Sequence, residues 1–204
     1  MISGSEKAGK GMSGRKTMTS EQVSRHSPPA IAILAGGCFW CTEAVLAGLR
    51  GVQAVCPGYI GGPLPGTANY EDVCSGQTGH AEAVRVEFDP AVISYRTLLE
   101  VFFMTHDPTQ LNRQGNDVGT QYRSAIFWLD EAQRACAEEV MAELAPLFPA
   151  PLVTQLQPAS EFYPAEAYHH DYYRRNPQQG YCAYVISPKL AKLRAKYAPL
   201  LNEA

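Results

Sequence analysis

The sequence predicts an α+β fold, in which one mixed sheet is covered by helices. Of the 204 residues, 46% are apolar and 18% are charged, a balance that buries a core and argues against a disordered chain. Segments with strand-like alternation are mixed with segments of helical periodicity, and the two kinds do not alternate strictly. No run approaches the roughly 18 apolar residues of a membrane-spanning helix. The net charge of −3 makes a nucleic-acid partner unexpected.

The first thirty residues are rich in Ser, Gly, Lys and Arg, and they contain no seven-residue apolar stretch that would indicate a secretory signal. We therefore expect a flexible polar tail over residues 1–30 and one folded domain over residues 31–204. Six cysteines are too sparse in a chain of this length to form a disulfide framework.

Patterned sequence begins with a short apolar run over residues 31–35, which two glycines end, as expected of a buried strand. Residues 38–49 then have the apolar spacing of a helix, and residues 51–60 resemble a second strand. Residues 61–78 are rich in Gly, Pro and Asn and predict a long loop. Loops of this length in a compact domain are usually functional or mobile.

The middle of the domain continues with a cleanly alternating strand over residues 81–88. Ser94 is a suitable cap for a helix that runs to about Thr105. A second long polar loop is expected over residues 106–121. The strand predicted over residues 122–129 is apolar on both faces, which favours a central position in the sheet.

The last elements are two helices and a short strand. Asp130 and Gln133 form a capping-box signature for a helix that ends near Leu144. Residues 152–156 are strand-like, and residues 188–201 predict a short basic helix.

Cys38 has the sequence context of a reactive cysteine, because it follows a strand and two glycines and begins a helix. Backbone N–H groups and the helix dipole favour negative charge there. The thiolate is the reactive form, and helix N-termini lower the pKa of cysteine. Phe39 and Trp40 place apolar rings beside the sulfur. We therefore expect a nucleophile with a lowered pKa at Cys38 and not a structural cysteine.

Two further cysteines are candidates for a partner of Cys38. Cys41 completes a C-x-x-C pattern, and it either meets Cys38 one turn into the helix or faces the core. A zinc site is not expected, because the sequence has no second ligand pair of suitable spacing. Cys182 follows a polar, Gly-containing stretch that we expect to be mobile. Mobility suits a thiol that must travel to another sulfur.

Glu82 is predicted to point into the protein. In the strand over residues 81–88, alternation places Glu82 on the face that carries Val84, Val86 and Phe88. Burial raises the pKa of a carboxyl group, so that it stays protonated near neutral pH and is able to donate a proton. The alternative is a strand end that has already turned towards solvent, since Glu82 lies near the start of the strand.

The two long loops contribute further polar groups, namely Tyr70 in the first loop and Asp117 and Tyr122 in the second. A tyrosine hydroxyl or a buried aspartate is suited to hold a polar oxygen near the sulfur. Taken singly, each is more typical of a satisfied surface or core residue.

Four segments, AGGCFWCTEA, TANYEDVCSGQTGHAEAVRV, GNDVGTQYRSAIF and AEAYHHDYYRRNPQQGYC, together resemble the peptide methionine sulfoxide reductase A family. The similarity runs from about Ile31 to Ser187. It implies a two-layer, ferredoxin-like α/β plait with long surface coils, and a single-domain cytoplasmic enzyme. Residues 31–204 are then the catalytic domain, which we expect to be a monomer.

The resemblance also implies roles for individual residues. Cys38 matches the nucleophile of the family, and Glu82 matches the acid that protonates the sulfoxide oxygen. The substrate-binding residues it implies are Phe39 and Trp40 for the methyl group, and Tyr70, Asp117 and Tyr122 for the oxygen. Cys182 matches a frequent recycling cysteine. Cys41 departs from the pattern of many members, so the recycling partner is Cys41, Cys182, or both in sequence.

Together the resemblance and the alternation lead to one reaction scheme. The Cys38 thiolate attacks the sulfoxide sulfur, Glu82 protonates the oxygen, and methionine leaves a sulfenic acid on Cys38. A second cysteine then forms a disulfide, which an external dithiol reduces. The resemblance implies thioredoxin as this reductant, the S-epimer of free or protein-bound methionine sulfoxide as substrate, and repair of oxidative damage. The scheme requires no metal and no organic cofactor.

Two other functions fit parts of the sequence. A thioredoxin-like disulfide oxidoreductase also has C-x-x-C at a helix start, but its chemistry has no need of Glu82. A non-catalytic thiol sensor, in which Cys38 is oxidised and changes partners, would show stoichiometric oxidation without turnover.

Overall fold

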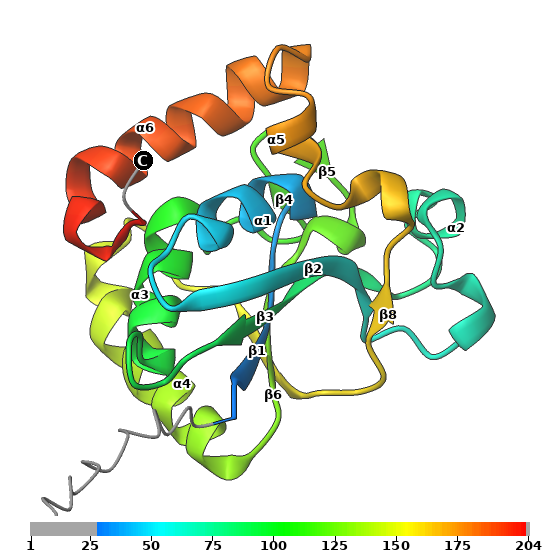
Figure 1. The fold of residues 1–204 in the computed structure, drawn as a ribbon. Coiled ribbons are helices and arrows are strands. Elements are labelled where there is room, and N and C mark those ends of the chain that lie inside the picture. Colours follow the sequence, from blue (N-terminus) through cyan, green and yellow to red (C-terminus); the bar gives the residue numbers. More distant parts are fainter. Residues whose placement is uncertain (1–27, 203–204) are drawn as a thin grey trace, which may run out of the picture.

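The computed structural model describes residues 28–202, so the predicted tail over residues 1–30 lies almost entirely outside the described residues. A six-stranded sheet forms the centre of the fold, in the order β7-β6-β1-β3-β2-β8 (Figure 1). Its strands are β1 (Ala30–Gly36), β2 (Val52–Ile60), β3 (Ala81–Phe88), β6 (Ser124–Trp128), β7 (Gln155–Pro158) and β8 (Tyr163–Pro164). The pair β6 and β7 is parallel and the other neighbouring pairs are antiparallel, so the predicted mixed sheet is confirmed.

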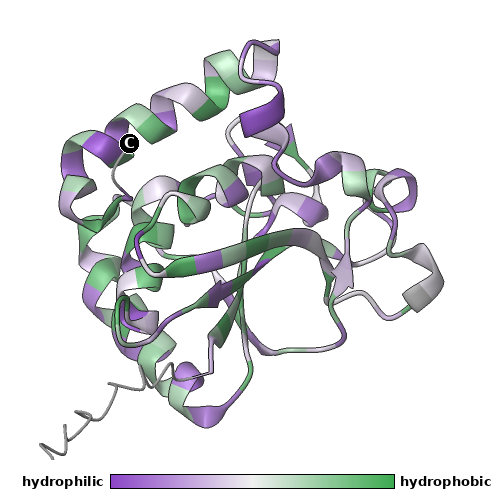
Figure 2. Cartoon of the chain, viewed as in Figure 1, coloured by the Kyte–Doolittle hydropathy of each residue, from purple (hydrophilic) through white to green (hydrophobic). Residues whose placement is uncertain are grey.

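Helices cover one face of this sheet. They are α1 (Phe39–Ala47), α2 (Tyr70–Cys74), α3 (Tyr95–Thr105), α4 (Glu131–Leu144), α5 (Tyr172–Arg175) and α6 (Ser187–Tyr197). Buried residues of α1, α3, α4 and α6 share a hydrophobic cluster with Val84, Val86 and Phe88 of β3. A smaller cluster on the opposite face includes Ala81 and Ala83. Polar and apolar residues alternate along α6, as expected of a helix with one buried face (Figure 2).

Helix caps explain where two of the predicted helices begin. The Ser94 side chain accepts a hydrogen bond from the Thr97 N–H at the start of α3. Asp130 accepts one from the Gln133 N–H at 2.8 Å at the start of α4. Both caps were predicted. The Gln133 side chain accepts from the Leu129 N–H at 3.1 Å and donates to the Ile31 carbonyl at 2.6 Å. The second of these bonds ties α4 to β1.

Two segments differ from the sequence-based expectation. The first long loop contains α2, which begins at Asn69 because its side chain accepts a hydrogen bond from the Asp72 N–H. The second loop contains a small hairpin of β4 (Arg113–Gln114) and β5 (Asp117–Val118). Most of both segments is irregular, as predicted, and these short elements are additions to the expected loops.

The segment around Cys182 was predicted to be mobile, and the structure contradicts this. A π-helical turn over Cys182–Ile186 leads directly into α6. Its buried residues are spaced at helical intervals, since Cys182, Ile186, Leu190 and Leu193 all lie in the core. This buried stripe holds the segment against the rest of the protein.

Within the described residues, no helix has the length and apolar character needed to cross a membrane.

Candidate active site

Cys38 lies where the chain turns from β1 into α1. It is the N-cap residue of α1, and its carbonyl accepts hydrogen bonds from the N–H groups of Cys41 and Thr42. Gly37 makes the turn possible. Its φ of +96° is unfavourable for other residues, and a Cβ there would lie 2.6 Å from the Gln114 side chain. Cys38 is 8% exposed, so the residue is largely covered by its neighbours.

Glu82 lies beside Cys38 on the interior face of the sheet. Its side chain is 2% exposed, so the prediction of an inward-facing carboxyl is confirmed and the alternative of a strand end turned to solvent is wrong. One carboxyl oxygen accepts a hydrogen bond from the Phe39 N–H at 3.0 Å. Since Phe39 follows Cys38 directly, this bond fixes the carboxyl next to the cysteine at the first turn of α1.

Burial, with a smaller contribution from the negative charges of Asp117 and Cys41, raises the pKa of Glu82 to about 8 against the opposing hydrogen bond from Phe39. A carboxyl group with this pKa is mostly protonated at pH 7. Glu82 is therefore a proton donor at neutral pH, as an acid catalyst needs to be.

The raised pKa of Glu82 predicts that stability decreases as pH rises. The folded state keeps a proton on Glu82 up to about pH 8, whereas an unfolded glutamate loses it near pH 4.3. Between these values the folded state binds more protons, so the free energy of unfolding falls with pH. The expected contribution of Glu82 is a loss of about 2 kcal/mol between pH 6 and pH 8.

Urea unfolding of the wild type and of Glu82→Gln at these two pH values measures this contribution. The wild type should lose about 2 kcal/mol more than the variant, because glutamine does not titrate. Equal losses in the two proteins would show that Glu82 is ionised in the folded state at neutral pH.

The expectation of a lowered pKa at Cys38 was wrong. Burial raises the pKa of Cys38 well above its usual value, and the hydrogen bond with Cys41 and the charge of Glu82 raise it further. Three N–H groups at the start of α1 already have other acceptors, because the Phe39 N–H donates to Glu82 and those of Cys41 and Thr42 donate to the Cys38 carbonyl. Cys38 is thus a thiol in the substrate-free protein at neutral pH.

Cys41 is buried in the core and also interacts with Cys38, so the two orientations considered for it do not exclude each other. The interaction with the Cys38 side chain lowers the pKa of Cys41 to about 7. The Cys41 sulfur also lies 3.5 Å from the Tyr181 hydroxyl, which donates to Asp117 at 2.6 Å. Tyr181 was missed by the sequence analysis, although it stands next to Cys182 in the GYC motif.

The predicted methyl-binding residues occupy different depths. Phe39 is fully buried, and its ring centroid lies 5.8 Å from that of Tyr59. Trp40 is partly exposed and stacks on Tyr172 with the ring centroids 3.7 Å apart. The Trp40 indole N–H donates to Nδ1 of His169 at 3.0 Å. An aromatic wall therefore begins immediately after Cys38, with Trp40 as its more accessible part.

Tyr70 and Tyr122 complete the polar side of the site. Burial raises the pKa of both phenols, and the negative charges of Glu82 and Cys38 raise them further. Both tyrosines therefore lie within electrostatic reach of Glu82 and Cys38. Each is partly exposed and able to meet a ligand that approaches Cys38.

Cys182 is fully buried, and its sulfur is a free thiol, like those of the other cysteines. Burial and the charge of Cys41 raise the pKa of Cys182. Cys41 therefore influences the pKa values of both Cys182 and Cys38.

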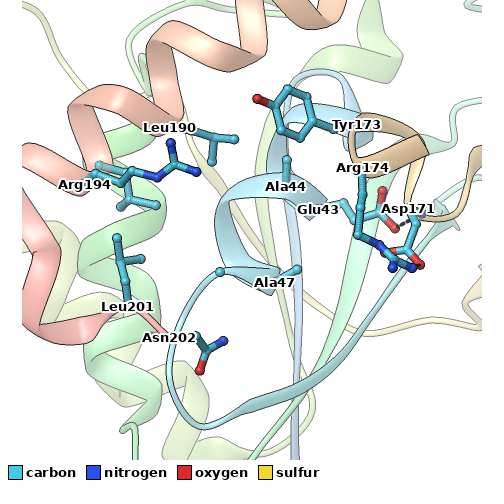
Figure 3. Close-up of a pocket in the computed structure, with 12 residues that line it drawn as sticks. Glu43, Ala44, Ala47, Asp171, Tyr173, Arg174, Leu190, Arg194, Leu201 and Asn202 are labelled. Carbon is cyan, nitrogen blue, oxygen red and sulfur yellow. Dashed lines mark hydrogen bonds and ion pairs between the residues drawn. The ribbon is translucent and has the colours of Figure 1, made fainter. Parts of the chain in front are cut away.

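A separate cavity of about 350 Å³ lies between α1, α5 and α6, and Figure 3 shows the residues that line it. Its floor is apolar and includes Leu190, and Glu43 beside it accepts a hydrogen bond from the Asp171 N–H at 2.8 Å. None of the predicted site residues lines this cavity.

Across residues 28–202 there is no cluster of three His, Cys, Asp or Glu side chains suited to a metal ion.

Comparisons with known proteins agree on one family. Residues 30–200 match the family model for peptide methionine sulfoxide reductase. The peptide methionine sulfoxide reductase MsrA of Deinococcus radiodurans is 58% identical over 192 residues, which cover 91% of this chain and 93% of that protein. The MsrA of Thermus thermophilus is also 58% identical, over 86% of this chain and 99% of its own length.

Solved structures show the same similarity. Reduced Mxr1 of Saccharomyces cerevisiae superposes with a TM-score of 0.70 at 34% identity, and the match covers 82% of this chain and 94% of that one. Methionine sulfoxide reductase A of Corynebacterium diphtheriae gives a TM-score of 0.71 at 35% identity, over 77% of this chain and 79% of that one.

Proposed function

Because this chain belongs to the peptide methionine sulfoxide reductase family, we propose that Cys38 is the nucleophile of its reaction and Glu82 the acid. The chain is an oxidoreductase that reduces methionine sulfoxide to methionine. The observation that carries the assignment is the 3.0 Å hydrogen bond from Phe39 to Glu82, which joins the residue after the nucleophile to a buried, protonated carboxyl.

In the proposed reaction, the Cys38 sulfur attacks the sulfoxide sulfur while Glu82 gives its proton to the sulfoxide oxygen. The sulfur–sulfur bond formed in this attack breaks as methionine leaves in its reduced form, the protonated oxygen is transferred to Cys38 as a sulfenic acid, and the proton of the Cys38 thiol restores Glu82 to its protonated form. The raised pKa of Cys38 implies that its proton is lost during the reaction with bound substrate and not beforehand. A protonated Glu82 favours this step, since it adds no negative charge beside the forming thiolate.

The substrate sulfoxide is held from two sides in this proposal. Phe39 and Trp40 receive the methyl group, and the hydroxyls of Tyr70 and Tyr122 surround the oxygen. Asp117 acts on the same side of the site, where it accepts a hydrogen bond from the Tyr181 hydroxyl. Fixing both groups leaves only one sulfoxide epimer with its sulfur towards Cys38, and one enzyme per epimer is the general pattern. We propose the S-epimer, in free methionine sulfoxide or in proteins whose oxidised methionines are repaired.

For regeneration, we propose that both further cysteines act in sequence. The side chain of Cys41 interacts with that of Cys38, and its pKa of about 7 is near the optimum for an attacking thiol. It condenses with the sulfenic acid and releases water. Cys182 then attacks the disulfide at Cys41, which returns Cys38 to its thiol form and leaves a Cys41–Cys182 disulfide for thioredoxin to reduce.

This sequence predicts that Cys182→Ser completes one turnover and then stalls with thioredoxin as the reductant, because the Cys38–Cys41 disulfide is then not passed on to Cys182. Product formed per enzyme, measured by rapid quenching, should be close to one. The matched control is Cys136→Ser on α4, which should turn over like the wild type. Mass spectrometry of oxidised wild-type protein should show a bridge to Cys182. A Cys38–Cys41 bridge and none to Cys182 would contradict the scheme.

Several broader features belong to the same proposal. The order β6-β1-β3-β2, with α1 and α3 as crossover helices, supports a ferredoxin-like plait. We further propose a monomeric cytoplasmic enzyme whose catalytic domain is residues 31–204.

One assay tests the proposed function against the alternatives. It supplies each epimer of methionine sulfoxide together with thioredoxin and its reductase, and it follows methionine production. We expect continuous turnover of the S-epimer. Reduction of protein disulfides without methionine production would instead support the disulfide oxidoreductase, and a single oxidation event without turnover would support the thiol sensor.

A further inference from the structure

A short turn that precedes α5 contacts the aromatic wall of the site. Glu166 is the N-cap of a 3-10 turn over Ala167–His169, and the His169 N–H donates to the Glu166 carbonyl at 2.9 Å. The turn is fixed to the sheet because the Ala165 N–H donates to the Pro57 carbonyl at 2.8 Å. The turn therefore has a defined position relative to β2.

His169 is buried in this turn at 1% exposure, and the reaction proposed above gives it no role. Its Nδ1 accepts the hydrogen bond from the Trp40 indole, which is a donor only. In a neutral imidazole the proton must then lie on Nε2, and Nε2 has no hydrogen-bond partner among residues 28–202. The nearest acidic group is the Glu166 carboxyl, 3.9 Å from Nε2.

The Glu166 carboxyl favours this arrangement of protons. Its negative charge faces Nε2 and stabilises a proton there, which leaves Nδ1 free to accept from Trp40. The carboxyl is itself held by the Tyr59 hydroxyl at 2.8 Å and by the Tyr70 N–H at 2.9 Å. Burial lowers the pKa of His169, so the ring stays neutral at pH 7 and Nδ1 remains an acceptor.

Trp40 needs this bond because its other main contact leaves one motion free. Stacking on Tyr172 at an interplanar angle of 5° fixes the plane of the indole but allows it to slide and rotate within that plane. The hydrogen bond to His169 removes this freedom. We infer that His169 is a positioning residue, which sets the in-plane orientation of Trp40 and thereby the shape of the pocket for the substrate methyl group.

The inference rests on the proposed role of Trp40 in substrate binding, but its first measurement does not use substrate. In a Trp128→Phe background, Trp40 is the sole tryptophan of the chain, since the sequence has two. His169→Phe keeps an aromatic ring and removes the acceptor. His169→Asn is the matched rescue variant, because its amide oxygen takes the place of Nδ1.

Loss of the acceptor should free the indole. We expect His169→Phe to shift the Trp40 emission to longer wavelength and to increase its quenching by acrylamide about twofold or more. KM for methionine sulfoxide should rise three- to tenfold, the range for one lost hydrogen bond. The change in kcat should be much smaller, because the pocket binds the methyl group equally well in the ground state and in the transition state. His169→Asn should restore most of both properties.

Two results would overturn the inference. One is wild-type emission and KM in His169→Phe. The other is an equal defect in His169→Asn and His169→Phe at the same unfolding midpoint, since the acceptor would then be irrelevant. A shifted emission with unchanged KM sustains the positioning by His169 and overturns the assignment of Trp40 to the substrate pocket, so the two ideas are distinguishable.

Discussion

Cys38→Ser is expected to lose essentially all reductase activity, by about 10⁴-fold or more. The substituted hydroxyl occupies nearly the same place at the N-cap of α1, but it is a far weaker nucleophile than sulfur and is unable to carry the oxygen as a sulfenic acid. Serine is also a favourable N-cap residue, so the helix should keep its start. The variant therefore separates the chemistry of sulfur from the stability of the fold.

The measurement is methionine formation with dithiothreitol as the reductant, which bypasses the regeneration steps. Cys136→Ser serves as the control, because it removes a thiol on α4 outside the site. Turnover of Cys38→Ser within tenfold of the wild type would show that another group attacks the sulfoxide.

Glu82→Gln is expected to lower kcat by about 10²- to 10⁴-fold, the usual contribution of general acid catalysis. The glutamine oxygen still accepts the Phe39 N–H, so the first turn of α1 should stay in place. What is lost is a proton that can be transferred. In the wild type, a carboxyl with a pKa of about 8 should cause kcat/KM to fall above that pH, and the variant should lack this contribution.

The matched control for this variant is Glu87→Gln. Glu87 lies on the same strand but on the opposite face, where it pairs with Arg85 at 2.5 Å. Its replacement should leave activity near that of the wild type. Near-wild-type turnover by Glu82→Gln would refute the acid role and leave the nucleophile intact.

Local patterns predicted the parts of the site that depend on neighbouring residues. Two-residue alternation was sufficient to place Glu82 in the interior, because the apolar residues that share its face follow at every second position of the same strand. The glycine pair and the helix start were sufficient to place Cys38 at the end of β1. The helix caps at Ser94 and Asp130 were equally local.

Local patterns could not predict contacts between residues that are far apart in the sequence. The error on the Cys38 pKa arose mainly because distant segments bury the thiol, and also because the carboxyl of Glu82, 43 residues from Phe39, lies beside it and takes the Phe39 N–H. Tyr181 and His169 reach the site from segments more than 100 residues after α1. Asn69 is a different case, since N-Y-E-D is a recognisable helix start that a closer inspection of the loop would have found.

The hydrogen bond from the main chain of Phe39 to the carboxyl of Glu82 ties this carboxyl to the residue that directly follows Cys38. The separation of acid and nucleophile is set by one short connection between α1 and β3, so it is insulated from rearrangements elsewhere in the molecule. Substitutions in remote parts of the core should consequently reduce the fraction of folded enzyme while each surviving molecule works at an unchanged rate.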